Sequence, residues 1–143
     1  MNNKISTITL PALDLKRSLT FYRDQLGFHI REETISEAHL AFELENGLFF
    51  VLIERAEFND FARMVNQTIA PKGNSECILT YFAGNRDEVD EILAKAKLAG
   101  VNPVSAQDKP WGYAGYFADI DGHMWEVIHN PKMYNTEVER TWN

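Results

Sequence analysis

The stretch YFADIDGHMWEVIHNP, residues 116–131, places a short acidic turn between two apolar runs. Apolar, β-branched and aromatic residues on both sides of a DG dipeptide predict an antiparallel β-hairpin. The second run contains Glu126, and a carboxylate on a strand that enters a core is costly to bury without a partner. The stretch therefore predicts a hairpin and makes Glu126 a candidate for function.

Three further elements are predicted upstream of this hairpin. SECILTYFA at 75–83 is an apolar run typical of a strand. RDEVDEILAKAKLAG at 86–100 carries apolar residues at helical spacing and ends in glycine, which predicts a helix. VNPVSAQ at 101–107 predicts an edge strand because it contains Pro103. The second half of the chain therefore predicts the order β-α-β-β-β.

The first half predicts the same order. Residues 5–12 alternate apolar and polar positions and are rich in β-branched residues, which indicates a strand. A helix is predicted over 13–28, with Asp14 as its N-cap and Gly27 at its end. Three strands are predicted to follow, the last two joined by an ENG turn, at 28–35, 38–45 and 48–55.

Two pairs of glycines support an internal duplication. The helix-ending glycines Gly27 and Gly100 lie 73 positions apart (100 − 27), and the hairpin glycines Gly47 and Gly122 lie 75 apart (122 − 47). We expect an α+β fold in which two βαβββ modules form a curved mixed sheet around a cavity. The expected parts are module one at about 4–55, a linker at about 56–74, module two at about 75–131 and a tail at 132–143, where Tyr134 and Trp142 are expected to pack.

Length, charge and cysteine content restrict the class of protein. The chain has 143 residues, the size of one domain, and a formal net charge of −7. That charge argues against nucleic acid and against an anionic membrane surface as partners. One cysteine, Cys77, rules out an intrachain disulfide and is expected to be a buried, inert thiol. With no signal-peptide pattern and no apolar run of membrane-spanning length, a cytoplasmic location is expected.

The two ends of the pattern carry a family resemblance. ITLPALDLKRSLTFYRDQLGF at 8–28 and GYFADIDGHMWEVIHNP at 115–131 resemble the vicinal oxygen chelate superfamily, which includes glyoxalase I, bleomycin-resistance proteins, fosfomycin-resistance transferases and extradiol dioxygenases. The resemblance covers roughly residues 4–131 and implies paired βαβββ modules. It also implies a homodimer and, in the enzymes of the family, a divalent metal held by His and Glu side chains.

When the family's metal-ligand positions are compared with this sequence one at a time, most of them lack a ligand residue. Glu126 matches the family's last ligand. The first ligand position, commonly histidine, falls on Thr7, and the symmetry mate of Glu126 falls on Val51. The remaining position lies on the strand at 75–83, where Leu79 or Tyr81 is expected to face inward. One carboxylate alone binds a divalent ion weakly, so we expect no complete metal site.

The four histidines offer other donors. His123 directly follows the turn and is expected to bond the turn's backbone, and strand alternation puts His129 on the face opposite Glu126. His29 and His39 lie in the first half, where each is a candidate for the cavity wall. Sequence spacing alone does not fix their distance from Glu126.

Three roles for Glu126 stay open at this point. It is a structural group paired with an arginine or a Tyr hydroxyl, a general base in a metal-free enzyme, or the group that bonds a bound ligand. KPWGYAGYF at 109–117 brings three aromatic residues together, and its loop Trp111 is the strongest ligand-binding candidate. The ligand-binding residues predicted with it are Thr7, Val51, Tyr81, Tyr113 and Met124.

The predicted function is therefore a glyoxalase-like protein that binds a small molecule in the cavity between the modules. It is either a binder of the bleomycin-resistance type or a metal-free enzyme, with Glu126 as the catalytic candidate. The alternative is a divalent-metal-dependent lyase or dioxygenase with non-standard ligands around Glu126. A structural or partner-binding role is a third hypothesis.

Overall fold

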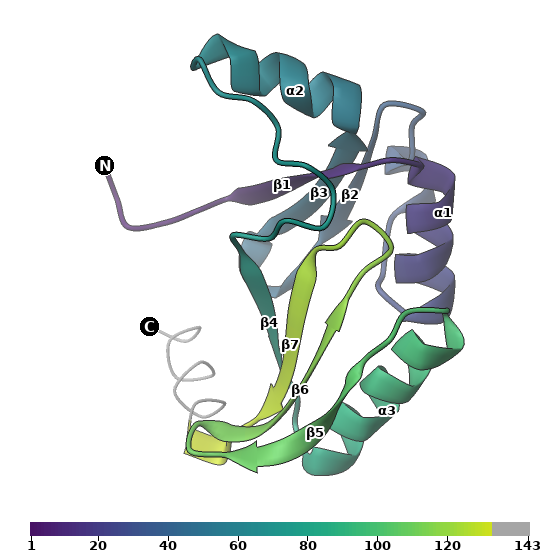
Figure 1. The fold of residues 1–143 in the computed structure, drawn as a ribbon, viewed down its shortest axis with the longest axis vertical. Helices are drawn as coiled ribbons and strands as arrows, with labels where there is room; N and C mark the ends of the chain where they lie inside the picture. Colours follow the sequence, from purple (N-terminus) through teal and green to yellow (C-terminus); the bar gives the residue numbers. More distant parts are fainter. Residues whose placement is uncertain (133–143) are drawn as a thin grey trace. The chain divides into compact units, whose positions relative to one another are not determined.

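The structure is a computed structural model that describes residues 1–132. The predicted packing of Tyr134 and Trp142 lies outside the described residues. The chain divides into two compact units, Met1–Pro71 and a second that begins at Lys72 (Figure 1). We describe each unit by itself.

The first unit is built on a three-stranded mixed sheet in the order β1-β3-β2. β1 runs parallel to β3, and β2 runs antiparallel to β3. A 3-10 turn joins β2 to β3, and the Leu44 N–H donates to the Leu48 carbonyl at 2.8 Å, which confirms the hairpin predicted at ENG. The strands are β1 (Thr7–Ala12), β2 (His39–Glu43) and β3 (Phe49–Glu54).

The helix predicted after β1 is present. It begins as α1 (Leu15–Leu19) and continues through π-helical turns over Thr20–Gln25. Asp14 is its N-cap, as predicted, and its carboxylate accepts two backbone N–H groups of the first turn at 3.0 and 3.2 Å. The chain leaves the helix at Gly27, whose φ of +86° favours glycine.

Aromatic rings fill the space between this helix and the sheet. Tyr22 is fully buried, and its ring centroid lies 5.2 Å from that of Phe50 on β3 and 5.8 Å from that of Phe42 on β2. Phe42 and Phe50 stack on each other at 5.9 Å. Edge and offset contacts of this kind add to the free energy gained by burying the rings. The helix thus covers one face of the first sheet.

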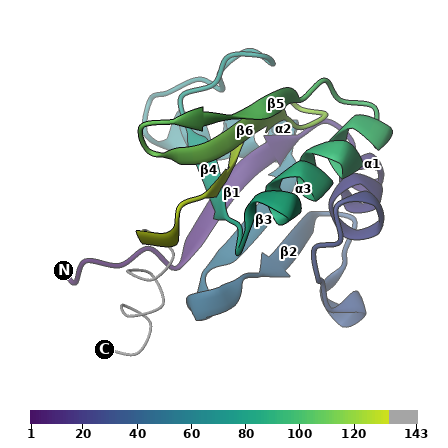
Figure 2. The same ribbon diagram turned by 90° about the horizontal axis from the view of Figure 1, so that it is seen from below.

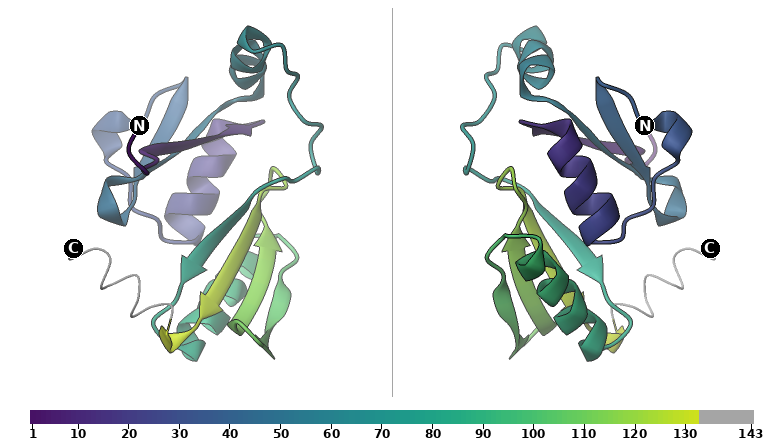
Figure 3. Two further views of the ribbon diagram at one scale, coloured as in Figure 1. Left: turned by 90° about the vertical axis from the view of Figure 1, so that its left-hand side faces the viewer. Right: turned by 90° about the vertical axis from the view of Figure 1, so that its right-hand side faces the viewer.

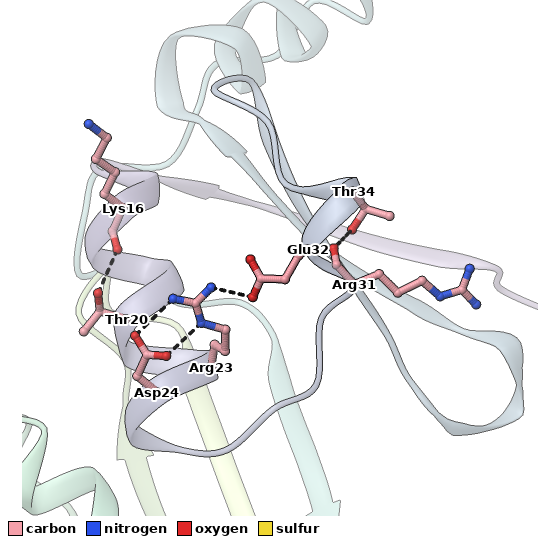
Figure 4. Close-up of polar contacts among 7 residues, drawn as sticks. All are labelled: Lys16, Thr20, Arg23, Asp24, Arg31, Glu32 and Thr34. Atoms are coloured by element: carbon pink, nitrogen blue, oxygen red, sulfur yellow. Dashed lines mark hydrogen bonds and ion pairs between the residues drawn. The ribbon is translucent and has the colours of Figure 1, made fainter.

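The strand predicted at 28–35 is absent, and this corrects the predicted module one. A 3-10 turn at Glu32–Thr34 replaces it, closed by the Thr34 hydroxyl, which donates to the Arg31 carbonyl at 2.7 Å. Figure 4 shows this turn beside the helix, where Arg23 forms an ion pair with Glu32 at 2.9 Å. Local side-chain hydrogen bonds compete with strand pairing, and here they hold the segment as a turn.

The segment after β3 forms α2 (Arg55–Met64), which settles the prediction of a short helix or loop between the halves. Asn59 on this helix accepts the Ile69 N–H at 3.3 Å, and Arg55 donates to the Ala70 carbonyl at 2.8 Å. These bonds tie the chain that leaves the helix back onto it.

The second unit contains a four-stranded sheet in the order β4-β7-β6-β5. β4 runs parallel to β7, and the other neighbours are antiparallel, with β5 and β6 side by side (Figure 2). The first and last strands of each unit are parallel neighbours, as a duplication predicts, and β5 is the additional edge strand. The elements are β4 (Ile78–Phe82), α3 (Arg86–Leu98), β5 (Val104–Lys109), β6 (Gly112–Ala118) and β7 (Met124–His129).

Helix α3 covers one face of this sheet (Figure 3). Asn85 caps it by accepting the Glu88 N–H at 2.8 Å, and Val89, Leu93 and Ala96 are its buried residues. A Cβ built on Gly115 of β6 would lie 2.3 Å from Leu93 Cδ1, so the missing side chain lets the helix approach the sheet. The mixed α+β architecture predicted from the sequence is confirmed.

Two other expectations concern single features. The prediction that Cys77 is buried is wrong: the thiol is exposed, because the residue precedes β4 instead of lying within it. Among residues 1–132, no helix combines the length and the apolar character that crossing a membrane requires.

Candidate functional site

The candidate site is a row of three polar side chains across the second sheet. Glu126 on the central strand β7 is in register with Thr80 on β4 and with Tyr116 on β6. Because residues paired across neighbouring strands share a face, these three side chains point to the same side of the sheet. We call Thr80, Glu126 and Tyr116 the polar row.

Both oxygens of Glu126 accept a hydrogen bond within the polar row. The Tyr116 hydroxyl donates to Oε2 at 2.7 Å, and the Thr80 hydroxyl donates to Oε1 at 3.1 Å. Glu126 and Tyr116 are half-buried, and Thr80 is exposed. The carboxylate is therefore oriented from both sides, which meets the requirement that a partly buried carboxylate have partners.

Tyr116 links the polar row to Trp111. The hydrogen bond to Glu126, and then burial, raise the pKa of the Tyr116 hydroxyl above its ordinary value, while a hydrogen bond from the Trp111 side chain acts in the opposite direction. The Trp111 side chain therefore lies near the Tyr116 hydroxyl, beside the polar row.

Trp111 occupies the turn between β5 and β6, as its sequence context suggested. Its backbone carbonyl accepts a 2.8 Å hydrogen bond from the Asn130 amide, which fixes the turn against the end of β7. The next residue, Gly112, has φ +137°, and a Cβ there would lie 2.8 Å from the His129 carbonyl oxygen. Trp111 is 47% exposed, so the residue is accessible for contact.

The polar row lies on the face of the sheet opposite α3. Leu93 of α3 approaches the side of β6 to which Gly115 belongs, and strand alternation puts Tyr116 on the other side. Met124 shares the face of Glu126, as predicted, and is half-buried. Ile78 pairs with Met124 and is 54% exposed. Apolar side chains therefore flank the polar row at one end.

Two predicted ligand-binding residues point toward α3 instead. The Tyr81 hydroxyl donates to Glu88 of α3 at 2.6 Å, and the Tyr113 hydroxyl donates to Asp90 of α3 at 2.7 Å. The expectation that Leu79 or Tyr81 faces with Glu126 is wrong, because the parallel pairing of β4 with β7 puts Thr80 there. The register of a parallel pair is set by the whole sheet, and the sequence of one strand did not specify it.

The predicted residues of the first unit lie on its own sheet. Val51 is half-buried on β3 and pairs with Thr9, and Thr7 is exposed and pairs with Phe49. Alternation puts Thr7 and Val51 on one face, opposite the face where Phe50 packs under the helix.

The histidines make local contacts. His129 Nδ1 lies 3.0 Å from the Ala83 carbonyl oxygen, on the face opposite Glu126 as predicted, and His39 Nδ1 lies 3.2 Å from the Ser36 hydroxyl. The backbone of His123 closes the turn: its N–H donates to the Asp119 carboxylate, and its carbonyl accepts the Asp119 N–H, both at 2.9 Å.

The donor chemistry of these positions does not fit a divalent metal of the family's kind. Two positions that hold metal ligands in the family are Thr7 and Val51 here, and the β4 residue in register with Glu126 is Thr80. Both Glu126 oxygens already accept a hydrogen bond from a hydroxyl group. Such a set supplies one carboxylate and no imidazole. Among residues 1–132, no group of three His, Cys, Asp or Glu side chains could hold an ion.

Comparison with known proteins identifies the class. The family model described as the Glyoxalase/Bleomycin resistance protein/Dioxygenase superfamily matches residues 4–127, so the chain belongs to this superfamily and the predicted resemblance is confirmed. No curated protein matches its sequence.

Solved structures share the fold. A glyoxalase-related enzyme from Fulvimarina pelagi is 23% identical, with a TM-score of 0.78 over 91% of this chain and 90% of that one. The manganese-bound fosfomycin resistance protein FosX of Listeria monocytogenes is 19% identical, with a TM-score of 0.68 over 97% and 99%. The antibiotic binding protein TnmS3 from Streptomyces sp. CB03234 is 20% identical, with a TM-score of 0.62 over 90% and 96%.

Proposed function

We propose that this protein binds a small molecule with a flat ring on the face of the second sheet opposite α3. Glu126 is the polar anchor, and Trp111 supplies the aromatic contact surface. The observation that carries the proposal is the Glu126 carboxylate, which accepts hydrogen bonds from Tyr116 at 2.7 Å and from Thr80 at 3.1 Å. Trp111, in the turn that leads into the strand of Tyr116, is exposed. An oriented carboxylate with an exposed aromatic ring nearby is a combination typical of ligand sites.

The relatives are consistent with two kinds of function. The antibiotic binding protein from Streptomyces favours a binder, and the manganese-bound protein from Listeria favours a metal-dependent enzyme. We favour the binder because the donor set around Glu126 suits hydrogen bonding better than metal coordination. The homodimer implied by the resemblance and the cytoplasmic location expected from the sequence stay predictions.

Titration calorimetry with the neutral probe 2-naphthamide tests the proposal. The wild-type protein is expected to bind it, and Trp111→Ala is expected to weaken binding severalfold because the aromatic surface is lost. Phe61→Ala is the matched control, since Phe61 is an aromatic residue of similar exposure (54%) on α2. Absence of binding to the wild type, or equal loss in both variants, would contradict the proposal.

A further inference from the structure

The direction of the hydrogen bonds in the polar row determines what the row offers to a ligand. An ionised carboxylate accepts and never donates, so the Thr80 and Tyr116 hydroxyls must both point their protons at Glu126. Each hydroxyl has a single proton. Neither Thr80 nor Tyr116 therefore keeps a proton for a ligand while Glu126 is ionised.

The groups that remain are acceptors. A carboxylate has about four lone-pair positions, and the row's own hydrogen bonds use two of those on Glu126. The Thr80 hydroxyl oxygen keeps its lone pairs. Among these described side chains, the row presents acceptors and one negative charge.

We infer that the ligand of this site is a flat, N–H-rich cation, such as an aryl amidine or guanidine, and that oxyanions are excluded. The inference rests on the proposed function. A forked N–H group matches a row of acceptors, and hydrogen bonds between ionised partners are the stronger kind. An anion such as a carboxylate or a phosphonate would meet lone pairs and a like charge.

Spacing and net charge support this ligand class. The row crosses three neighbouring strands, which lie about 4.8 Å apart in a sheet. A ligand with N–H groups on both sides of one carbon can therefore bond Glu126 while its ring lies toward Trp111. The formal net charge of −7 also favours the approach of cations to the protein as a whole.

Four naphthalene probes with one ring and different head groups separate the possibilities by calorimetry. 2-Naphthamidine has the charge and the N–H donors, trimethyl(2-naphthyl)ammonium has the charge alone, 2-naphthamide is neutral, and 2-naphthoate is an anion. We expect 2-naphthamidine to bind at least about tenfold more tightly than 2-naphthoate and more tightly than the trimethylammonium probe. Equal binding of the two cations, or tighter binding of 2-naphthoate, would overturn the inference.

Substitutions in the row provide a second readout. In Glu126→Gln the side-chain amide donates as well as accepts, so one hydroxyl of the row can turn its proton toward a ligand. The preference for 2-naphthamidine over 2-naphthoate is therefore expected to shrink about tenfold.

Thr80→Val removes one acceptor and is expected to weaken 2-naphthamidine binding severalfold. Thr9→Val on β1 is its control, because Thr9 is an exposed threonine in the first unit. An unchanged preference in Glu126→Gln would contradict the inference.

The pattern of results distinguishes this inference from the function on which it rests. If 2-naphthamide binds and Trp111→Ala weakens it, but the head group makes no difference, the site exists and the inference is wrong. If none of the four probes binds the folded wild-type protein, the proposed function fails and the inference fails with it. Thermal melting of each variant shows whether it is folded.

Discussion

At Gly115, the backbone of β6 lies too close to α3 for any side chain. A Cβ there would lie 2.3 Å from Leu93 Cδ1 and 2.9 Å from the Val104 carbonyl oxygen, while the φ angle lies outside the left-handed region. The glycine is therefore required by packing and not by backbone conformation. On the neighbouring strand β5, the register shifts between Val104 and Gln107.

Gly115→Ala is expected to lower the free energy of unfolding by about 1–3 kcal/mol, since the new methyl group displaces the Leu93 side chain and crowds the β5 backbone at Val104. Urea unfolding measures the change. Gly84→Ala is the control, because the nearest atom to a Cβ there is Glu88 Oε2 at 3.5 Å. Equal stability of the two variants would show that the helix does not pack on β6 in this way.

The Tyr116 hydroxyl provides a prediction about pH. Its pKa is raised, first by the hydrogen bond to Glu126, and a tyrosine with a raised pKa stabilises the fold fully below its ordinary pKa of 10.0. That contribution is lost as pH rises through the folded-state pKa. In a spectrophotometric titration of wild type, one tyrosine attributable to Tyr116 should ionise late, and Glu126→Gln should bring its pKa back down.

Tyr113 serves as a control for this titration. Its pKa is raised first by the hydrogen bond to Asp90, so Asp90→Asn should lower the pKa of Tyr113 and leave that of Tyr116 unchanged. Tyr116→Phe identifies the signal, because that variant lacks the hydroxyl. If Tyr116→Phe keeps every late-ionising tyrosine of the wild type, the assignment is contradicted.

At the scale of elements, the end of the β5–β6 hairpin is held by α3. On the α3 side, the Arg86 guanidinium makes two hydrogen bonds to Asp108, at 2.6 and 3.2 Å, and lies 3.9 Å from the Tyr113 ring centroid. Asp108 and Tyr113 are the second cross-strand pair from the turn that carries Trp111. Arg86 thus ties the end of the hairpin to α3.

Arg86→Lys keeps the charge and loses the bidentate geometry, so the hairpin end is expected to open more often. Amide hydrogen exchange over residues 108–113 should become severalfold faster, with little change in global stability because the pair is exposed. Arg31→Lys, which alters the exposed ion pair with Glu43 in the first unit, is the control. Unchanged exchange over the hairpin would contradict this role.

Element patterns were predictable where local chemistry decides them. Asp14 and Gly27 mark the ends of the first helix, and the ENG and DG turns join antiparallel strands. The segment 28–35 was not predictable as a turn, since its apolar residues resemble a strand and the competing side-chain bonds are visible only in the structure.

The candidate site was predictable in part. Glu126 was proposed from its position in a strand and Trp111 from its position in a loop, and a Tyr hydroxyl was among the partners proposed for the carboxylate, as the hydrogen bond from Tyr116 shows. Thr80 was missed because the parallel register of β4 on β7 depends on pairing between distant segments. A comparison of the alternation on β4 with that on β7 could have suggested it.

At the scale of the whole molecule, membership of the superfamily raises the question of a metal. The positions that match the family's ligands contain one carboxylate and no imidazole. We therefore expect no bound divalent ion that stabilises the fold. Thermal melting should be unchanged by EDTA and by added Mn²⁺, because an ion that bound the folded state would stabilise it. Stoichiometric Zn, Ni, Mn or Fe in the purified protein would favour the metal-dependent alternative.

Chemical-shift mapping with 2-naphthamidine locates the ligand without assuming an activity. In ¹H–¹⁵N spectra of the whole chain, we expect the largest shifts on the Trp111 indole and on the amides of Thr80, Tyr116 and Glu126. Glu126→Gln is expected to reduce these shifts at equal probe concentration. Shifts centred on other residues, or spectra unchanged at saturating probe, would contradict the claim that the polar row is a ligand site.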